Sequence, residues 1–274
     1  MSNWDAFQEE WDQSGDHLLP KVSIIIPTLN SAPLIASTLE TLLEQDYPDY
    51  EIIVIDAASK DRTMEVVKSL RDNRVKVYSV SSYSRYEMLN KGITHAEGEY
   101  LNFLFPGDFY LHQKTLRTMI RLAQENENPS MVYCGTVLRA REKPARILYR
   151  KLTLNLLRSG RQPTSLQSCW FKSDVFKRLG MFDTGLQQRG GLDLMCRIML
   201  NGTLKSASTN RVFTDYDLRA VTQDMVVRHF WETMQIVNRY FGFGATLVWL
   251  CRQKDIGRYL KLWRKSLKAA FTGK

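Results

Sequence analysis

The chain has 274 residues, 44% of them hydrophobic, and its 38 lysines and arginines against 29 acidic residues give a formal net charge of +9 at pH 7. This length and composition suit one large domain with a full buried core better than two independent domains. No stretch of about 20 apolar residues occurs, so we expect no membrane-spanning helix, and the four cysteines show no paired spacing, which argues against a disulfide framework and favours a reducing cytosol.

The first segment, residues 1–19, is acidic and polar and lacks the basic and apolar regions of a signal peptide. We expect it to be a flexible or loosely docked arm. The main domain is expected to span residues 20–219 and to be followed by C-terminal helices with a basic tail over residues 220–274.

Two apolar runs, residues 22–26 and 52–56, flank a segment with helical spacing over residues 33–44. Runs of this kind are typical of buried parallel strands. Strand, helix and strand at this length form a right-handed crossover unit, and such units bind ligands outside the carboxyl ends of their strands. The polar residues of segment 27–30 and Asp56 are therefore candidates for binding a ligand.

The turn after the second strand carries two carboxylates and two hydroxyls, those of Asp56, Ser59, Asp61 and Thr63. It has none of the glycines of a phosphate-binding loop, and neither a dinucleotide fingerprint nor a P-loop occurs in the chain. We expect Ser59 or Asp61 to cap the helix that follows. Capping does not account for Asp56, whose carboxylate suits a nucleobase edge or ribose hydroxyls.

The rest of the main domain continues the alternation of strands and helices, which predicts an α/β fold with a mostly parallel mixed sheet covered by helices on both faces. Further strands are expected near 75–80, 99–104, 131–137, 167–171 and 206–213, and further helices near 62–72, 84–95, 113–126, 173–179 and 191–201. Residues 138–162 are basic and poorly periodic, so we expect a loop or a mobile insert there.

The ordered segments resemble the inverting glycosyltransferases of family 2. The matching segments are Pro27-x-x-Asn30, Asp56-x-x-Ser59-x-Asp61-x-Thr63, and residues 86–93, 96–108, 171–183 and 193–197. The resemblance spans about residues 20–215 and depends on the whole series rather than on one motif. It implies a GT-A-type fold and transfer of a sugar from a nucleoside diphosphate donor, most consistent with a UDP-linked one, to a hydroxyl of a glycan or a lipid-linked saccharide.

The resemblance also implies residues for the donor. These are Pro27, Thr28, Asn30, Asp56, Ser59 and Lys91 for the substrate, and Asp108 for both the diphosphate and a divalent cation, Mn²⁺ or Mg²⁺. The family commonly offers two acidic or amide residues to the cation, whereas Phe105 occupies the first of these positions here. We expect the carboxylates of Asp56 and Asp108 to face one cleft.

The sequence identifies the catalytic base less clearly than it identifies the residues for the donor. The carboxylate that the family places six residues before Arg197 is replaced by Gly191, which cannot take a proton. Asp193 is the acidic residue left nearby, and we predict it as the base. Its alternative role is to orient the start of the helix or to pair with Arg197 at i,i+4 spacing.

The C-terminal region has its own pattern. A helix is expected from Thr222 to about Tyr240, with a hinge over residues 241–244. Residues 251–274 then combine eight lysines and arginines with an apolar stripe, a pattern typical of a helix lying on an anionic membrane. The alternative is a stripe that packs back on the domain. No nucleic-acid-binding fold accompanies the charge, so we do not expect nucleic acid as a partner.

These observations predict a cytoplasmic glycosyltransferase that is peripheral on the inner face of a membrane. The departures at Phe105 and Gly191 keep a second hypothesis open, a nucleotide-sugar-binding partner subunit with weak or no catalysis. A sugar-phosphate nucleotidyltransferase is excluded because the glycine-rich, lysine-bearing loop after the first strand is missing.

Overall fold

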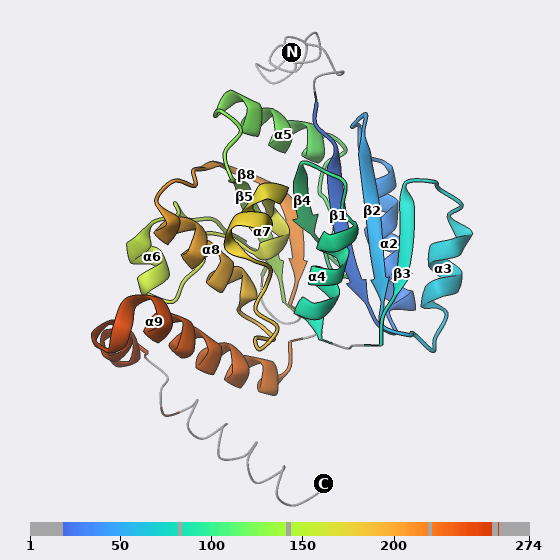
Figure 1. The fold of residues 1–274 in the computed structure, drawn as a ribbon. Helices are drawn as coiled ribbons and strands as arrows, with labels where there is room; N and C mark the ends of the chain where they lie inside the picture. Colours follow the sequence, from blue (N-terminus) through green and yellow to red (C-terminus); the bar gives the residue numbers. More distant parts are fainter. Residues whose placement is uncertain (1–18, 82–83, 141–143, 219–220, 254–256, 258–274) are drawn as a thin grey trace, which may run out of the picture.

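Eight strands form one mixed sheet, in the order β3-β2-β1-β4-β7-β5-β6, with β8 paired to β5 (Figure 1). This computed structural model describes residues 19–81, 84–140, 144–218, 221–253 and 257. The strands are β1 Val22–Thr28, β2 Tyr50–Asp56, β3 Val75–Ser79, β4 Tyr100–Phe103, β5 Met131–Arg139, β6 Arg146–Leu148, β7 Cys169–Lys172 and β8 Ser206–Asp217. β1 to β4 are mutually parallel where they pair, and β7 runs antiparallel to β4 and β5.

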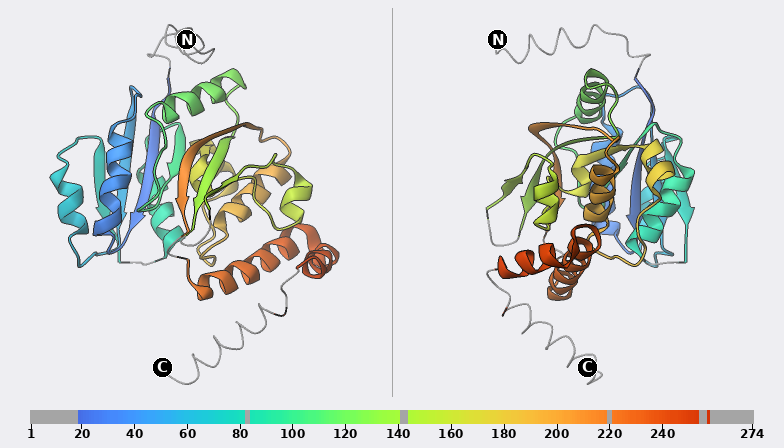
Figure 2. Two further views of the ribbon diagram at one scale, coloured as in Figure 1. Left: turned by 180° about the vertical axis from the view of Figure 1, so that it is seen from behind. Right: turned by 60° about the vertical axis from the view of Figure 1, so that its left-hand side comes forward.

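Helices cover both faces of the sheet (Figures 1 and 2). These are α2 Ala32–Leu43, α3 Thr63–Ser69, α4 Arg85–His95, α5 Thr115–Glu125, α7 Ser173–Leu179 and α8 Gly190–Asn201, whereas α6 Leu154–Arg158 and α9 Gln223–Cys251 pack against α8 and each other. Successive side chains of β1 point to opposite faces. Ile24 and Ile26 pack with α2 and α5, whereas Ile25 packs with α4, α7 and α8. This doubly covered sheet confirms the predicted α/β fold.

The basic segment over residues 138–162 is more regular than predicted. β5 continues to Arg139, β6 pairs antiparallel with it, and α6 follows. The expectation of a loop was therefore wrong for these elements. A three-residue strand and a five-residue helix are too short to show a periodicity.

The C-terminal helix α9 begins after Thr222, whose hydroxyl accepts a hydrogen bond from the backbone N–H of Met225 at 3.3 Å. Gly242 has φ 79° and ψ 174°, so α9 consists of two helical halves joined by a kink, where the sequence predicts a hinge. Within the part of the chain that the structure describes, no helix is both long and apolar enough to cross a bilayer. The predicted arm lies almost entirely, and the basic tail mostly, outside the described residues.

Close packing of α4 on the sheet gives a first testable prediction. A Cβ added at Gly92 lies 2.3 Å from Cγ2 of Ile25, whereas one added at Gly244 in α9 meets no atom within 4 Å. We expect Gly92→Ala to lower the free energy of unfolding by about 1–3 kcal/mol, because an overpacked core shifts side chains and backbone. Gly244→Ala is the matched control and is expected to raise it by up to about 1 kcal/mol. Urea unfolding measures both, and equal stabilities of the two variants would contradict this packing.

Candidate functional site

The loops that follow β1 and β2 meet at the carboxyl edge of the sheet. Thr28 lies opposite Asp56 in the parallel register, and the backbone N–H of Ala57 donates to the Thr28 carbonyl at 2.9 Å. Asn30 adopts φ 48°, in the left-handed region that asparagine tolerates better than most residues. Its side-chain oxygen accepts a hydrogen bond from the backbone N–H of Lys60 at 2.8 Å, so that the two loops are fastened together.

Asp56 is buried at this junction, with 3% of its surface exposed. Its carboxylate accepts hydrogen bonds from the backbone N–H of Ser59 at 3.0 Å and from the Ser59 hydroxyl at 2.5 Å. The Ser59 oxygen in turn accepts the backbone N–H of Asn30 at 2.9 Å. Ser59 and Asn30 thus hold Asp56 in place. Asp61 accepts the backbone N–H of Thr63, the first residue of α3, at 3.0 Å, but the N-cap position is Arg62, which makes no side-chain capping bond, so neither Ser59 nor Asp61 is the N-cap.

Thr28 carries an unsatisfied polar atom at the same edge. Its hydroxyl oxygen is buried and has no hydrogen-bond partner. A buried hydroxyl without a partner costs free energy unless a bound molecule supplies the hydrogen bond. Thr28, a residue that the sequence predicts for the substrate, therefore carries a hydroxyl that a bound ligand would satisfy, and it lies opposite Asp56.

A pocket of about 640 Å³, which we call the sheet-edge pocket, opens beside this junction. Pro27 and Ser31 line it from the loop after β1, and Arg85 and Phe105 line it from α4 and from the loop after β4. Lys91 is exposed on α4 and does not line this pocket. Of the predicted substrate residues, only Pro27 lines this pocket; Thr28, Asn30, Asp56 and Ser59 lie at the adjoining junction of the two loops, and Lys91 lies apart from both.

Asp108 lies beyond β4 with only 2% of its surface exposed. One carboxylate oxygen accepts the backbone N–H of Asp217 at 3.0 Å, and the other accepts the side-chain amide of Gln167 at 2.8 Å and the backbone N–H of Phe105 at 3.2 Å. Both oxygens therefore face protein donors. Neither Asp108 nor Asp56 lines the sheet-edge pocket or the second pocket described below, so these pockets do not provide the common cleft that the sequence predicts for the two carboxylates.

This arrangement does not fit a tight divalent-cation site. A hard cation requires several oxygen ligands with free lone pairs, whereas Phe105 replaces one predicted ligand and carries the guanidinium of Arg85 over its ring at 4.6 Å. Among the residues that the structure describes, no group of three or more histidine, cysteine, aspartate or glutamate side chains is placed to hold a metal. Asp108 is the predicted ligand that remains, and its protein contacts do not suit that role.

Burial raises the pKa of the Asp108 carboxyl from its usual 3.8 to about 7. The folded protein then binds this proton more tightly than the unfolded chain does, so the stabilisation that Asp108 contributes is complete below about pH 4 and is lost as the pH rises to about 7. We expect the parent to lose about 2–4 kcal/mol of stability relative to Asp108→Asn across this window. Urea unfolding at several pH values in EDTA measures the difference, and a constant difference would contradict the prediction.

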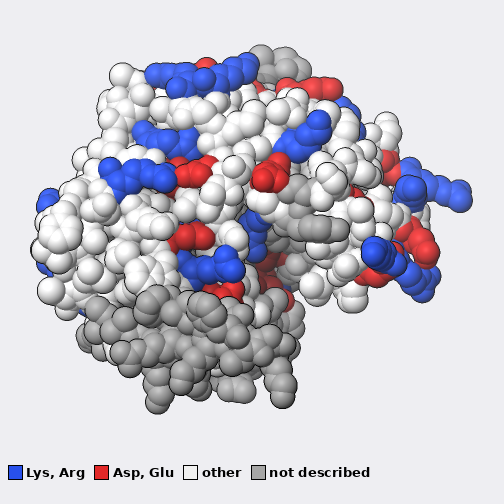
Figure 3. Space-filling model, turned by 60° about the horizontal axis from the view of Figure 1, so that its bottom comes forward, with Lys and Arg blue, Asp and Glu red and all other residues white. Residues whose placement is uncertain are grey.

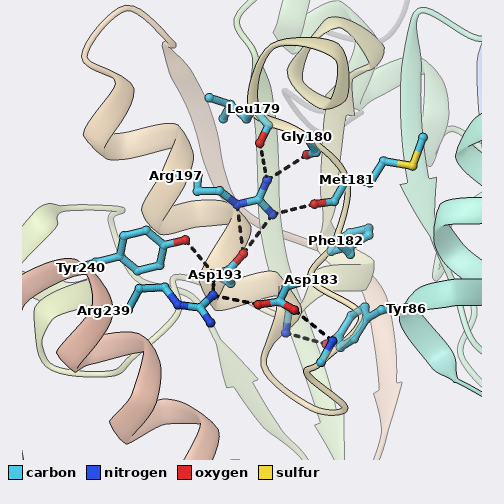
Figure 4. A network of polar contacts seen from close by, with 12 residues as sticks. Tyr86, Leu179, Gly180, Met181, Phe182, Asp183, Asp193, Arg197, Arg239 and Tyr240 are labelled. Atoms are coloured by element: carbon cyan, nitrogen blue, oxygen red, sulfur yellow. Dashed lines mark hydrogen bonds and ion pairs between the residues drawn. The ribbon is translucent and has the colours of Figure 1, made fainter.

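Asp193, the predicted base, lies in a network of charged groups between α8 and α9 (Figure 4). One carboxylate oxygen bonds Arg197 at 2.9–3.0 Å, and the other accepts Arg239 at 3.1 Å and the Tyr240 hydroxyl at 2.7 Å. The side chain is buried, with 1% of the residue exposed, and lines neither pocket described in this section. Its role as a base stays a prediction, and these contacts favour the alternative, an i,i+4 ion pair with Arg197.

A second pocket, of about 510 Å³, adjoins the sheet-edge pocket and shares Arg85, Phe105 and Gln188 with it. We call it the arginine pocket, because five arginines line it: Arg85, Arg146, Arg150, Arg161 and Arg189. No described aspartate or glutamate lines it. Gly191, the residue at the family's base position, contributes to its wall, so this is where the family's carboxylate would be expected.

Several residues that shape the site were not predicted from the sequence. Gln167 binds Asp108, and Glu232 of α9 accepts the backbone N–H groups of Gln187, Gln188 and Arg189 at 2.8 Å each, which fixes the loop before α8. For Glu232, the one signal in the sequence was its place among the apolar residues of the helical pattern of α9. Nothing local identifies its partners, which lie more than 40 residues earlier in the chain.

Comparison with known sequences gives one family. The sequence model described as "Glycosyl transferase family 2" matches residues 23–180. A "PGL/p-HBAD biosynthesis glycosyltransferase" of Mycobacterium bovis is 29% identical over 124 residues, which are 44% of this chain and 48% of that protein. A "GalNAc(5)-diNAcBac-PP-undecaprenol beta-1,3-glucosyltransferase" of Campylobacter jejuni is 36% identical over 111 residues, 39% of this chain and 36% of that protein. The aligned region is thus about half of these relatives or less.

Solved structures show the same fold. TarS of S. aureus in complex with UDP-GlcNAc superposes with a TM-score of 0.65 at 19% identity, over 92% of this chain and 73% of that one. The mannosyltransferase PcManGT of Pyrobaculum calidifontis, in complex with GDP-Man and Mn²⁺, gives 0.61 at 18% identity, over 97% and 87% of the two chains. These likenesses show that the chain has the GT-A-type fold.

Proposed function

Because the chain belongs to glycosyltransferase family 2, we propose that it transfers a sugar from a nucleoside diphosphate donor, UDP-linked, to a hydroxyl of a glycan or of a lipid-linked saccharide, with inversion at the anomeric carbon. The observation that carries the proposal is the sheet edge at which Asp56 is buried and held by Ser59, next to the unpartnered hydroxyl of Thr28. The carboxylate of Asp56 is suited to accept hydrogen bonds from the nucleoside, and the Thr28 hydroxyl gains a partner when the donor binds.

The reaction is a single displacement. The acceptor oxygen forms a bond to the anomeric carbon as the bond from that carbon to the diphosphate breaks, and the acceptor proton passes to a base. Pro27 and Asp56 would orient the donor in this scheme, and the nearby cation of Arg85 would stabilise the charge on the leaving diphosphate. A divalent cation at Asp108 remains a prediction, and because the contacts of Asp108 do not suit a metal, no step is assigned to one.

One observation favours the second hypothesis, a nucleotide-sugar-binding subunit with weak or no catalysis. Gly191 stands at the base position in the wall of the arginine pocket, and no described carboxylate lines that pocket. Asp193, the nearest acidic residue along the helix, has both oxygens engaged by Arg197, Arg239 and Tyr240. Binding of donor without turnover is the behaviour that this hypothesis predicts.

The test is a thermal-shift screen of UDP-, GDP- and TDP-sugars, with and without Mn²⁺, followed by measurement of hydrolysis or transfer for each sugar that binds. Stabilisation by a UDP-sugar together with turnover supports the proposed reaction. Stabilisation without turnover, unchanged in Asp193→Ala, supports the binding subunit. No stabilisation by any nucleotide sugar would contradict both.

We also propose that the protein is peripheral on the inner face of a membrane. After the kink of α9, Phe243, Leu247 and Val248 expose 70%, 45% and 50% of their surfaces, an apolar strip at the end of the described chain. The basic residues of the following segment would add attraction to anionic lipids. Co-sedimentation with liposomes containing anionic lipid tests this: loss of binding on deleting residues 254–274 supports the proposal, and unchanged binding contradicts the role of the tail.

A further inference from the structure

We propose that the arginine pocket binds a phosphate or diphosphate group of the acceptor, so that the acceptor is an amphiphile whose anionic group joins its sugar to an apolar chain. This inference rests on the proposed transfer and names the substrate class for the acceptor side of that site. It follows from the charge, the burial and the position of the pocket.

The positive charge of the pocket is not neutralised by ion pairs among the described residues, although the carboxylate of Glu232 lies near Arg189 and accepts its backbone N–H at 2.8 Å. None of its five arginines forms an ion pair with a carboxylate of the described residues. Burial and the neighbouring cations Arg161 and Arg146 lower the pKa of Arg150, which shows that like charges are gathered there. Arg150 and Arg161 bond only neutral groups, the Gln162 carbonyl at 3.1 Å and the Ser159 hydroxyl at 2.9 Å.

Arg189 is the strongest evidence for an anion-binding site, because only 6% of its surface is exposed. Its guanidinium donates to the carbonyl of Gly160 at 2.7 Å and to the side-chain oxygen of Gln162 at 2.5 Å, both of them neutral acceptors. Its buried Nε has no hydrogen-bond partner. A buried charge without an ion-pair partner is costly, and guanidinium groups match phosphate oxygens with two parallel hydrogen bonds.

Three of the five arginines, Arg146, Arg150 and Arg161, are exposed, so they can be compared with other exposed basic residues. On the face seen in Figure 3, lysine and arginine side chains lie close to aspartate and glutamate side chains. On α9, for example, Arg228 is paired with Asp224 at 2.8 Å. The acid-free lining of the arginine pocket therefore differs from the surroundings of Arg228, which has a carboxylate partner.

The position of the pocket assigns the anion to the acceptor. On one side it joins the sheet-edge pocket, where the donor is proposed to bind. On the other it shares Gly160, Arg161 and His229 with a third pocket, of about 1000 Å³. That third pocket is mixed in character: Leu156, Phe230, Val248 and Trp249 form an apolar part of its wall, and polar and basic side chains, among them Lys151 and Arg252, form the rest. A phosphate in the arginine pocket would thus lie between a sugar near the donor and an apolar chain leading toward the exposed end of α9.

Isothermal titration calorimetry with inorganic pyrophosphate and with farnesyl diphosphate, each added to protein saturated with UDP, tests the proposal. We expect both to bind, farnesyl diphosphate more tightly, and the double variant Arg150→Gln/Arg161→Gln to weaken binding by about 10- to 100-fold, as the loss of charge-assisted hydrogen bonds predicts. Arg228→Gln removes one positive charge outside the pocket and is the matched control, expected to bind as the parent does. The affinity for UDP alone is measured for all variants.

The outcomes separate the possible sources of the phosphate. If UDP prevents pyrophosphate from binding, the arginines serve the donor's own diphosphate and the assignment to the acceptor is overturned. Binding that is equal in the double variant and in Arg228→Gln would overturn the pocket itself. If UDP and all UDP-sugars fail to bind while pyrophosphate binds through Arg150 and Arg161, the proposed donor is wrong and the anion site stands.

Discussion

Asp193→Ala is expected to lower the free energy of unfolding by about 3–5 kcal/mol, the range typical of removing one partner from a buried ion pair. The carboxylate contacts Arg197 within α8 and Arg239 and Tyr240 of α9, and only 2% of its side chain is exposed. Its removal leaves two guanidinium groups next to each other without their shared counter-charge. Urea unfolding followed by circular dichroism measures the loss.

Asp183→Ala is the control for this network, because Asp183 also bonds Arg239, at 2.8 Å, but at the surface, where a third of its side chain is exposed. Exposed ion pairs contribute about 0–1 kcal/mol, so this variant is expected to remain nearly as stable as the parent. The opposite pattern would identify Asp193 as the base: unchanged stability of Asp193→Ala together with a loss of sugar transfer and retained UDP binding.

Asp56→Asn is expected to weaken the binding of UDP by about 10- to 100-fold, because the amide keeps the volume of the side chain but loses the charge that strengthens hydrogen bonds to the nucleoside. The effect should appear in the affinity for UDP more than in turnover at saturating donor. Calorimetric titration with UDP measures it.

Ser59→Ala distinguishes the contribution of the Asp56 carboxylate to UDP binding from the contribution of the hydrogen bond that holds this carboxylate. This variant removes the hydroxyl that donates to Asp56 at 2.5 Å but leaves the carboxylate in place, together with the Ser59 backbone N–H bond at 3.0 Å. We expect an intermediate loss of UDP affinity, smaller than that of Asp56→Asn. Equal UDP affinities of the parent and Asp56→Asn, with both proteins folded, would contradict the placement of the nucleoside at this sheet edge.

Much of the fold was predictable because it is encoded locally. The apolar run of β1 places Ile24 and Ile26 on one face and Ile25 on the other, and both faces are covered by helices, as an uninterrupted apolar strand predicts. The hydrogen bond of Asp61 at the start of α3 and the kink at Gly242 likewise depend on residues close to one another in the chain. The short elements β6 and α6 were missed because a few residues show no period.

The candidate site was predictable only as far as its chemistry is local. The sequence by itself placed Asp56 after a buried strand, close to Ser59, and predicted that it meets the residues after the first strand, because parallel strands end at a common edge; the register that sets it opposite Thr28 comes from the structure. It also identified the two departures, Phe105 and Gly191, since a residue type can be read without a structure. These features determined the family, the fold and the proposed position of the donor.

Only the tertiary structure showed which carboxylates are already engaged by other groups of the protein. Asp108 is occupied by Gln167 and by the backbone of Asp217, and Asp193 by Arg239 and Tyr240 of another helix. The arginine pocket gathers side chains from α4, from the β6–α6 region and from the loop before α8. Burial and the occupation of lone pairs depend on partners far away in the chain, and no local pattern records which of them come together.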